Sequence, residues 1–108
     1  MDRNDVREVI KFLAKCLREN GVEPLRVILF GSQSRGEATE ESDIDIVVLS
    51  ESFSNKGIFE RADMIKGAER ETIRHFLVPL DVIPMTPEEF DSGSSIIAEY
   101  AKSGEVIL

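Results

Sequence analysis

Two short apolar runs, separated by a polar stretch, constrain the fold of this 108-residue chain most strongly. The first run covers residues 26–30 and the second covers residues 44–49. Runs of this length that are rich in valine, isoleucine and leucine favour buried strands. Because side chains alternate along a strand, Asp43 and Asp45 are expected to point to one face, while Ile44 and the next two even-numbered residues point into a core.

The pair Asp43 and Asp45 places two ionised carboxylates side by side at the start of the second run. Like charges this close repel each other unless a cation lies between them. Mg²⁺ bound to a nucleoside triphosphate supplies such a cation, so the pair predicts a metal-dependent nucleotide site. The alternative is a solvated strand edge without a role in binding.

Gly31 and Ser32 end the first run, where a strand would turn into a helix or a tight loop. Gly31 has no side chain and lets the backbone approach a ligand closely. The Ser32 hydroxyl and the next backbone N–H groups would form an anion cradle that suits a β,γ-diphosphate. Arg35 is a candidate charge partner for phosphate, or otherwise an ordinary surface arginine. A Walker A loop is excluded, because Glu37-Ala38 stand where lysine and a hydroxyl residue are required.

The stretch Gly31-Ser32, ten intervening residues and Asp43-Ile44-Asp45 resembles the signature of the DNA polymerase beta-like nucleotidyltransferase superfamily. Within that superfamily, Arg35-Gly36 and the short chain are most similar to the minimal nucleotidyltransferases of bacteria and archaea. The resemblance implies a small polymerase beta-like fold and transfer of a nucleoside monophosphate, with AMP from ATP as the expected case.

The resemblance also implies a third carboxylate on a later strand, and Asp81 lies in the apolar stretch 78–84. Asp43, Asp45 and Asp81 are then expected to hold two Mg²⁺ ions and to carry catalysis. Gly31, Ser32 and Arg35 are expected to bind the nucleotide. The alternative for Asp81 is the polar face of an edge strand, where Pro79 and Pro84 limit hydrogen bonding.

Members of this group often act as antitoxins that add AMP to a tyrosine of a HEPN-type partner protein. The resemblance therefore implies a protein adenylyltransferase with such a partner. Two alternatives stay open. One is a transferase acting on a small hydroxylated molecule such as an antibiotic, with a pocket built between two copies of the chain. The other is a nucleotide-binding or partner-binding module without catalysis.

Length, charge and cysteine content limit the number of domains, the class of acceptor and the cellular location that we expect. We expect one domain over residues 1–108, too short to include a second, acceptor-binding domain. The formal net charge of −8 works against a DNA or RNA acceptor. Cys16 is the one cysteine, which excludes an intrachain disulfide and suits the cytoplasm, and we expect neither a signal peptide nor a membrane span. His75 has no second histidine beside it and receives no role.

The remaining pattern predicts the order α, β, β, α, β, α with a possible final strand. The expected helices cover about residues 6–17, 58–75 and 94–102, the expected strands cover residues 26–30, 44–49, 77–84 and 106–108, and Asp5 with Glu8 is spaced like a capping box. Asn20-Gly21 predicts a helix end, and Thr86-Pro87 with Glu89 predicts a helix start. We therefore expect an α/β (α+β) fold, with a small mixed sheet backed by helices on one face and the carboxylates on the other face or at one end.

Overall fold

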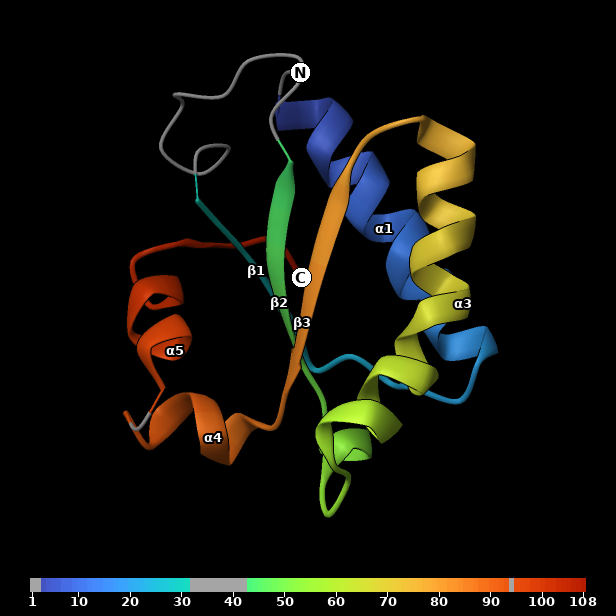
Figure 1. Cartoon of the computed structure of the whole chain (residues 1–108). Helices are drawn as coiled ribbons and strands as arrows, with labels where there is room; N and C mark the ends of the chain where they lie inside the picture. Colours follow the sequence, from blue (N-terminus) through green and yellow to red (C-terminus); the bar gives the residue numbers. More distant parts are fainter. Residues whose placement is uncertain (1–2, 32–42, 94) are drawn as a thin grey trace.

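The computed structural model describes residues 3–31, 43–93 and 95–108, and these form a mixed α/β fold, as predicted (Figure 1). The elements in chain order are α1 (Arg3–Glu19), β1 (Arg26–Phe30), β2 (Ile44–Leu49), a 3₁₀ turn (Glu51–Phe53), α3 (Ile58–Phe76), β3 (Leu80–Met85), α4 (Pro87–Asp91), α5 (Ile96–Ala101) and β4 (Glu105–Val106). The strand order in the sheet is β3-β2-β1-β4. The pair β2–β3 is parallel, whereas β1–β2 and β1–β4 are antiparallel.

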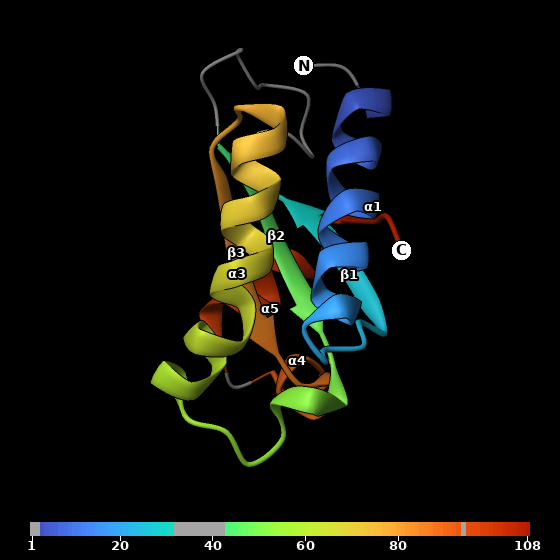
Figure 2. The same ribbon diagram turned by 90° about the vertical axis from the view of Figure 1, so that its right-hand side faces the viewer.

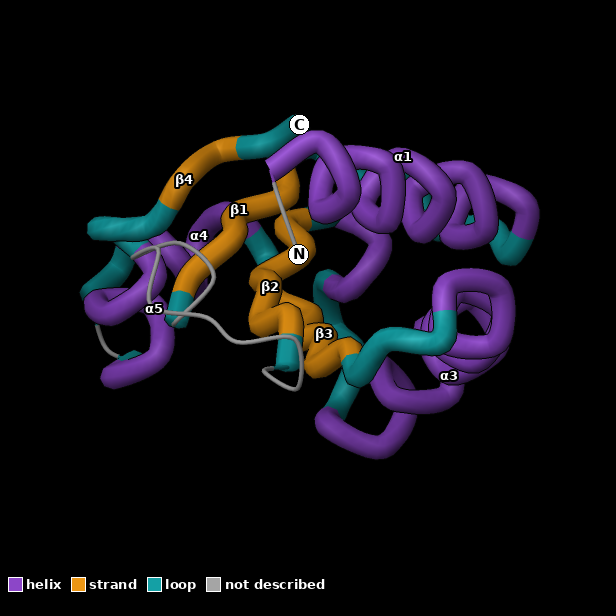
Figure 3. Tube along the Cα trace, turned by 90° about the horizontal axis from the view of Figure 1, so that it is seen from above, coloured by secondary structure: helices purple, strands orange, loops and turns teal. Residues whose placement is uncertain are grey.

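Helices cover both faces of this sheet, which corrects the expectation of helices on one face. The long helices α1 and α3 lie side by side on one face (Figure 2), and the short helices α4 and α5 lie on the other (Figure 3). The reason lies in β2, in which residues 46–49 are all buried, so the strand has an apolar side chain to cover on each face. Ile44, Ile46 and Val48 point into the core under α1 and α3, as predicted. Val47 and Leu49 point into a second core under α4 and α5.

The predicted boundaries hold for β1 and β2, and α1 ends before Gly21, whose φ of +84° suits glycine. The helix α3 matches its predicted range, but the third strand begins at Leu80 and not at Leu77, because Leu77 caps the end of α3. Leu77 then adopts the left-handed conformation (φ 55°, ψ 42°), and its N–H donates to the Ile73 carbonyl. Asp5 lies inside α1, which begins at Arg3, and so does not stand before the helix as the predicted capping box requires.

The capping box predicted from Thr86 and Glu89 is present and starts α4. The Thr86 hydroxyl accepts from the Glu89 N–H at 3.1 Å, and Glu89 Oε1 accepts from the Thr86 N–H at 2.8 Å. Because α4 ends at Asp91, a separate short helix precedes α5, and the observed order contains one helix more than predicted. This turn of helix brings Phe90 over the second core.

Replacing Gly104 with alanine is expected to destabilise the fold. A Cβ atom at this position would collide with the backbone carbonyl oxygen of Leu29 in β1, which cannot move without disturbing the sheet. Overpacking of this kind costs about 1–3 kcal/mol. The matched control is Gly67→Ala in the middle of α3, where the added Cβ meets only Asn20 Oδ1 at 3.6 Å. Thermal unfolding should show a lower Tm for Gly104→Ala and an equal or higher Tm for Gly67→Ala.

Candidate functional site

The strand register places Asp45 and Asp81 next to each other. Asp45 of β2 is the Cα partner of Asp81 in the parallel neighbour β3, so both side chains lie on the same face of the sheet. Asp43 lies directly before β2, two residues ahead of Asp45 in the chain. Asp45 also shares its face with Val47, which α4 and α5 cover further along the strand. The three predicted carboxylates therefore belong to one end of the sheet, on the face that carries α4 and α5.

The charges at this end of the sheet act on one another. The pKa of Asp45 lies above its ordinary value, first because the carboxyl group is partly buried, then because Asp81 and Asp43 repel its negative charge. Among the described residues, no lysine or arginine forms an ion pair with Asp45. The site thus concentrates negative charge that the described part of the chain does not neutralise.

Gly31, at the end of β1, fits tightly against Asp45. Its φ is +77°, and a Cβ atom built at this position would lie 2.6 Å from Asp45 Oδ2. Both the backbone conformation and the space therefore require glycine. In the antiparallel pairing of β1 with β2, Phe30 lies opposite Asp45, which brings the end of β1 to the start of β2. The glycine predicted from the sequence therefore lies beside Asp45, one of the predicted carboxylates.

The other two residues predicted to bind nucleotide, Ser32 and Arg35, lie outside the described residues. Their roles stay predictions from the sequence.

The fit of the site to Mg²⁺ can be judged from its donor atoms. Carboxylate oxygens are the ligands that Mg²⁺ prefers, and Asp43, Asp45 and Asp81 supply them on one end of the sheet. Within residues 3–31, 43–93 and 95–108, however, no group of three or more His, Cys, Asp or Glu side chains is arranged as a metal site. The chemistry and the charge of these residues suit Mg²⁺, and its binding there stays a prediction.

Glu69 of α3 is a further carboxylate near this site that the sequence analysis did not single out. Its Oε2 atom accepts a hydrogen bond from the Val82 N–H at 3.3 Å, directly after Asp81 in β3. Burial raises the pKa of Glu69, the Val82 N–H opposes that rise, and the charge of Asp81 adds to it. The sequence feature that could have identified Glu69 is its helical spacing. Glu69 follows buried Ile65 by four residues and so lies on the inward side of α3.

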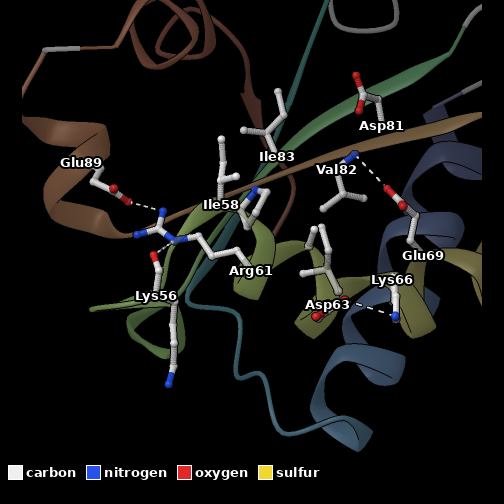
Figure 4. Close-up of a pocket in the computed structure, with 13 residues that line it drawn as sticks. Lys56, Ile58, Arg61, Asp63, Lys66, Glu69, Asp81, Val82, Ile83 and Glu89 are labelled. Atoms are coloured by element: carbon white, nitrogen blue, oxygen red, sulfur yellow. Dashed lines mark hydrogen bonds and ion pairs between the residues drawn. The ribbon is translucent and has the colours of Figure 1, made fainter.

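A groove of about 580 Å³ leads away from Asp81 between α3 and the edge of β3 (Figure 4). Arg61 of α3 closes its other end by pairing with Glu89 of α4 at 2.7 Å and by donating to the Lys56 carbonyl at 2.9 Å. This pairing, together with the Thr86 cap, keeps the pKa of Glu89 below its usual range despite partial burial. The groove therefore has a carboxylate of the predicted site at one end and an ion pair that links two helices at the other.

Comparisons with known proteins give the family of this chain. The family model described as "Nucleotidyltransferase domain" matches residues 9–103. The chain belongs to this nucleotidyltransferase family. The match runs from within α1 to beyond the end of α5, and it includes Gly31 and all three predicted carboxylates.

Two relatives from Methanocaldococcus jannaschii carry a more specific name. The chain is 29% identical over 90 residues to "Putative protein adenylyltransferase MJ1305", an alignment that covers 82% of this chain and 60% of that protein. It is 32% identical over 80 residues to "Putative protein adenylyltransferase MJ0141", with coverage of 73% and 79%. The chain thus spans less than two thirds of the first of these relatives.

Among solved structures, the nucleotidyltransferase fold is similar to a chain in a structure described as "toxin-antitoxin with AMP-PNP". The TM-score is 0.65 at 22% identity, and the match covers 94% of this chain and 72% of that chain. At this identity the likeness concerns the fold alone. Separately, no helix in the described ranges is long and apolar enough to cross a membrane.

Proposed function

We propose that this nucleotidyltransferase domain transfers AMP from ATP to a tyrosine hydroxyl of a HEPN-type partner protein and so acts as an antitoxin. The observation that carries the proposal is the adjacency of Asp45 and Asp81, with Gly31 held against Asp45, in a chain that matches the nucleotidyltransferase family. Two relatives are named as protein adenylyltransferases, and a similar fold occurs in a toxin-antitoxin structure with a nucleotide analogue. These comparisons support a protein acceptor.

In the proposed reaction, the tyrosine oxygen attacks the α-phosphorus of ATP. A bond forms between that oxygen and phosphorus, the bond to the β-phosphate oxygen breaks, and pyrophosphate leaves. Asp81, exposed on the edge strand, accepts the hydroxyl proton. Gly31 and Ser32 hold the outer phosphates, which directs the attack to the α-phosphorus.

Asp43, Asp45 and Asp81 would hold Mg²⁺. When bound, the ions neutralise the charge that gathers on the phosphates and on the attacking oxygen. The pKa of Asp45 is raised first by burial and then by repulsion from Asp81 and Asp43, and no described lysine or arginine forms an ion pair with it. A bound cation would relieve that repulsion, which supports this assignment. The formal net charge of −8 also favours a partner protein with a basic surface.

The test is to incubate the purified protein with Mg²⁺, α-labelled ATP and the protein encoded by the neighbouring gene. We expect label on a partner tyrosine, found by mass spectrometry, together with release of pyrophosphate. Labelling should disappear when EDTA is added and when Asp43 and Asp45 are both replaced by alanine. A stable complex without any label would contradict enzymatic transfer and favour neutralisation by binding, whereas label on an added hydroxylated antibiotic would favour the small-molecule acceptor.

A further inference from the structure

The groove beside β3 carries an inference about how the partner docks, and this inference rests on the function proposed above. Figure 4 shows Asp81 at one end of the groove, with Ile58 and Arg61 toward the other. Because Asp81 lines this end of the groove at the edge of β3, an acceptor in the groove ends next to one of the predicted catalytic carboxylates. What the walls of the groove present to solvent then decides which class of acceptor it suits.

An exposed apolar side chain lies at the end of the groove away from Asp81, and a second one follows it in the sequence. Ile58, which lines the groove, is 77% exposed, and Phe59 beside it is 84% exposed. They form the first turn of α3, where nothing in the described fold requires large apolar groups. A small, heavily hydroxylated acceptor would leave both side chains in water, whereas a protein segment with apolar side chains would bury them. The groove therefore suits a protein acceptor.

The edge of β3 does not offer a place for an added strand. The carbonyl groups of Pro79 and Met85 accept hydrogen bonds from the β2 side, so even-numbered residues of β3 present their backbone groups to the open edge. Of these, the Val82 N–H already donates to Glu69, and Pro84 has no N–H. A partner segment therefore binds here through its side chains and not by extending the sheet.

The charges along the groove also suit a basic partner. Among the described residues, three basic and four acidic ones line the groove, with Lys56 at its apolar end. The other two basic residues are already paired within the chain, Arg61 with Glu89 at 2.7 Å and Lys66 with Asp63 at 3.2 Å. They would repel a basic partner only weakly, and Asp81 and Glu69 add negative charge at the other end of the groove. The groove thus combines acidic groups near the predicted site with an apolar end.

We infer that this groove docks the segment of the partner protein that carries the acceptor tyrosine. Its hydroxyl lies at Asp81, and apolar side chains of the same segment pack on Ile58 and Phe59 at the start of α3. The groove then determines which tyrosine is modified, separately from the nucleotide site on the sheet.

The test compares the double variant Ile58→Ser, Phe59→Ser with the control Ile96→Ser. Ile96 is 89% exposed, and it lies on α5, which packs against β1 and α4 and does not line the groove. The probe is the protein encoded by the neighbouring gene, with its Kd measured by calorimetry and its labelling measured from α-labelled ATP. We expect the double variant to weaken partner binding and labelling by at least about tenfold, because it removes two buried apolar contacts. Its affinity for Mg²⁺-ATP and its Tm should match those of the wild type and of Ile96→Ser.

The outcomes separate this inference from the proposed function. If the wild type binds the partner without labelling it, the proposed transfer fails, while the Kd of the double variant still tests the groove. If labelling occurs and the double variant binds as tightly as the wild type, the groove is not the docking site. If the wild-type protein neither binds nor labels that partner and modifies a hydroxylated antibiotic instead, both proposals are overturned.

Discussion

Replacing Asp45 with asparagine is expected to lower nucleotidyl transfer by at least about 10³-fold. Asparagine has almost the same size, so the strand and its register with Asp81 stay in place. What is lost is the central negative charge of the predicted site. The measurement is the rate of pyrophosphate release with Mg²⁺-ATP and the partner protein. The matched control is Asp91→Asn, an exposed carboxylate at the end of α4 away from the site, which should leave the rate unchanged.

The same substitution is expected to stabilise the protein at neutral pH without metal. The pKa of Asp45 is raised in the folded state, so the folded protein holds this proton more tightly than the unfolded chain does. Its contribution to stability therefore falls as the pH rises from the ordinary carboxyl pKa through the raised one, and it is least favourable above both. Asparagine removes that penalty, so in EDTA at neutral pH the variant should melt above the wild type, with the difference closing in acid.

Adding Mg²⁺ should change this comparison, because a ligand that binds the folded state raises the Tm. The wild type should gain stability with Mg²⁺, and Asp45→Asn should gain much less. A full rate of transfer by the variant, or the same response of both proteins to Mg²⁺, would contradict a metal-binding and catalytic role for Asp45.

Replacing Gly31 with alanine is expected to reduce transfer by about 10²-fold or more, because it displaces a group that must be accurately positioned. The new Cβ would lie 2.6 Å from Asp45 Oδ2, and the carboxylate is the group that can move. The positive φ of 77° adds about 1–2 kcal/mol of backbone strain. The measurements are the rate of transfer and the Tm of the same preparation.

Gly21→Ala is a matched control for this change. Gly21 has a φ of +84°, close to that of Gly31, but a Cβ there meets nothing within 4 Å. Both variants should therefore lose similar stability, while Gly31→Ala alone loses activity. Equal activity in the two variants would show that the close fit between Gly31 and Asp45 does not matter for transfer.

The sequence was informative where a local pattern carries its own physical reason. Residues 26–30 and 44–49 form strands as predicted, and the Thr86 cap starts a helix, because alternation and capping depend on near neighbours in the chain. The start of β3 was misplaced because Leu77, which gives no local stop signal, adopts a left-handed conformation at the end of α3. Glu69 was missed although its spacing from Ile65 indicates the inward side of α3, because its partner Val82 lies 13 residues away in the chain.

The sequence by itself determined the family signature, the strands that carry it and the three aspartates of the predicted site. Only the tertiary structure decided that β3 pairs in parallel with β2, which places Asp81 beside Asp45, and that helices cover both faces of the sheet. It also formed the groove between α3 and the edge of β3. These features depend on how distant segments pack. Strand pairing and side-chain burial bring together residues that are far apart in the chain, and the local sequence pattern does not specify such contacts.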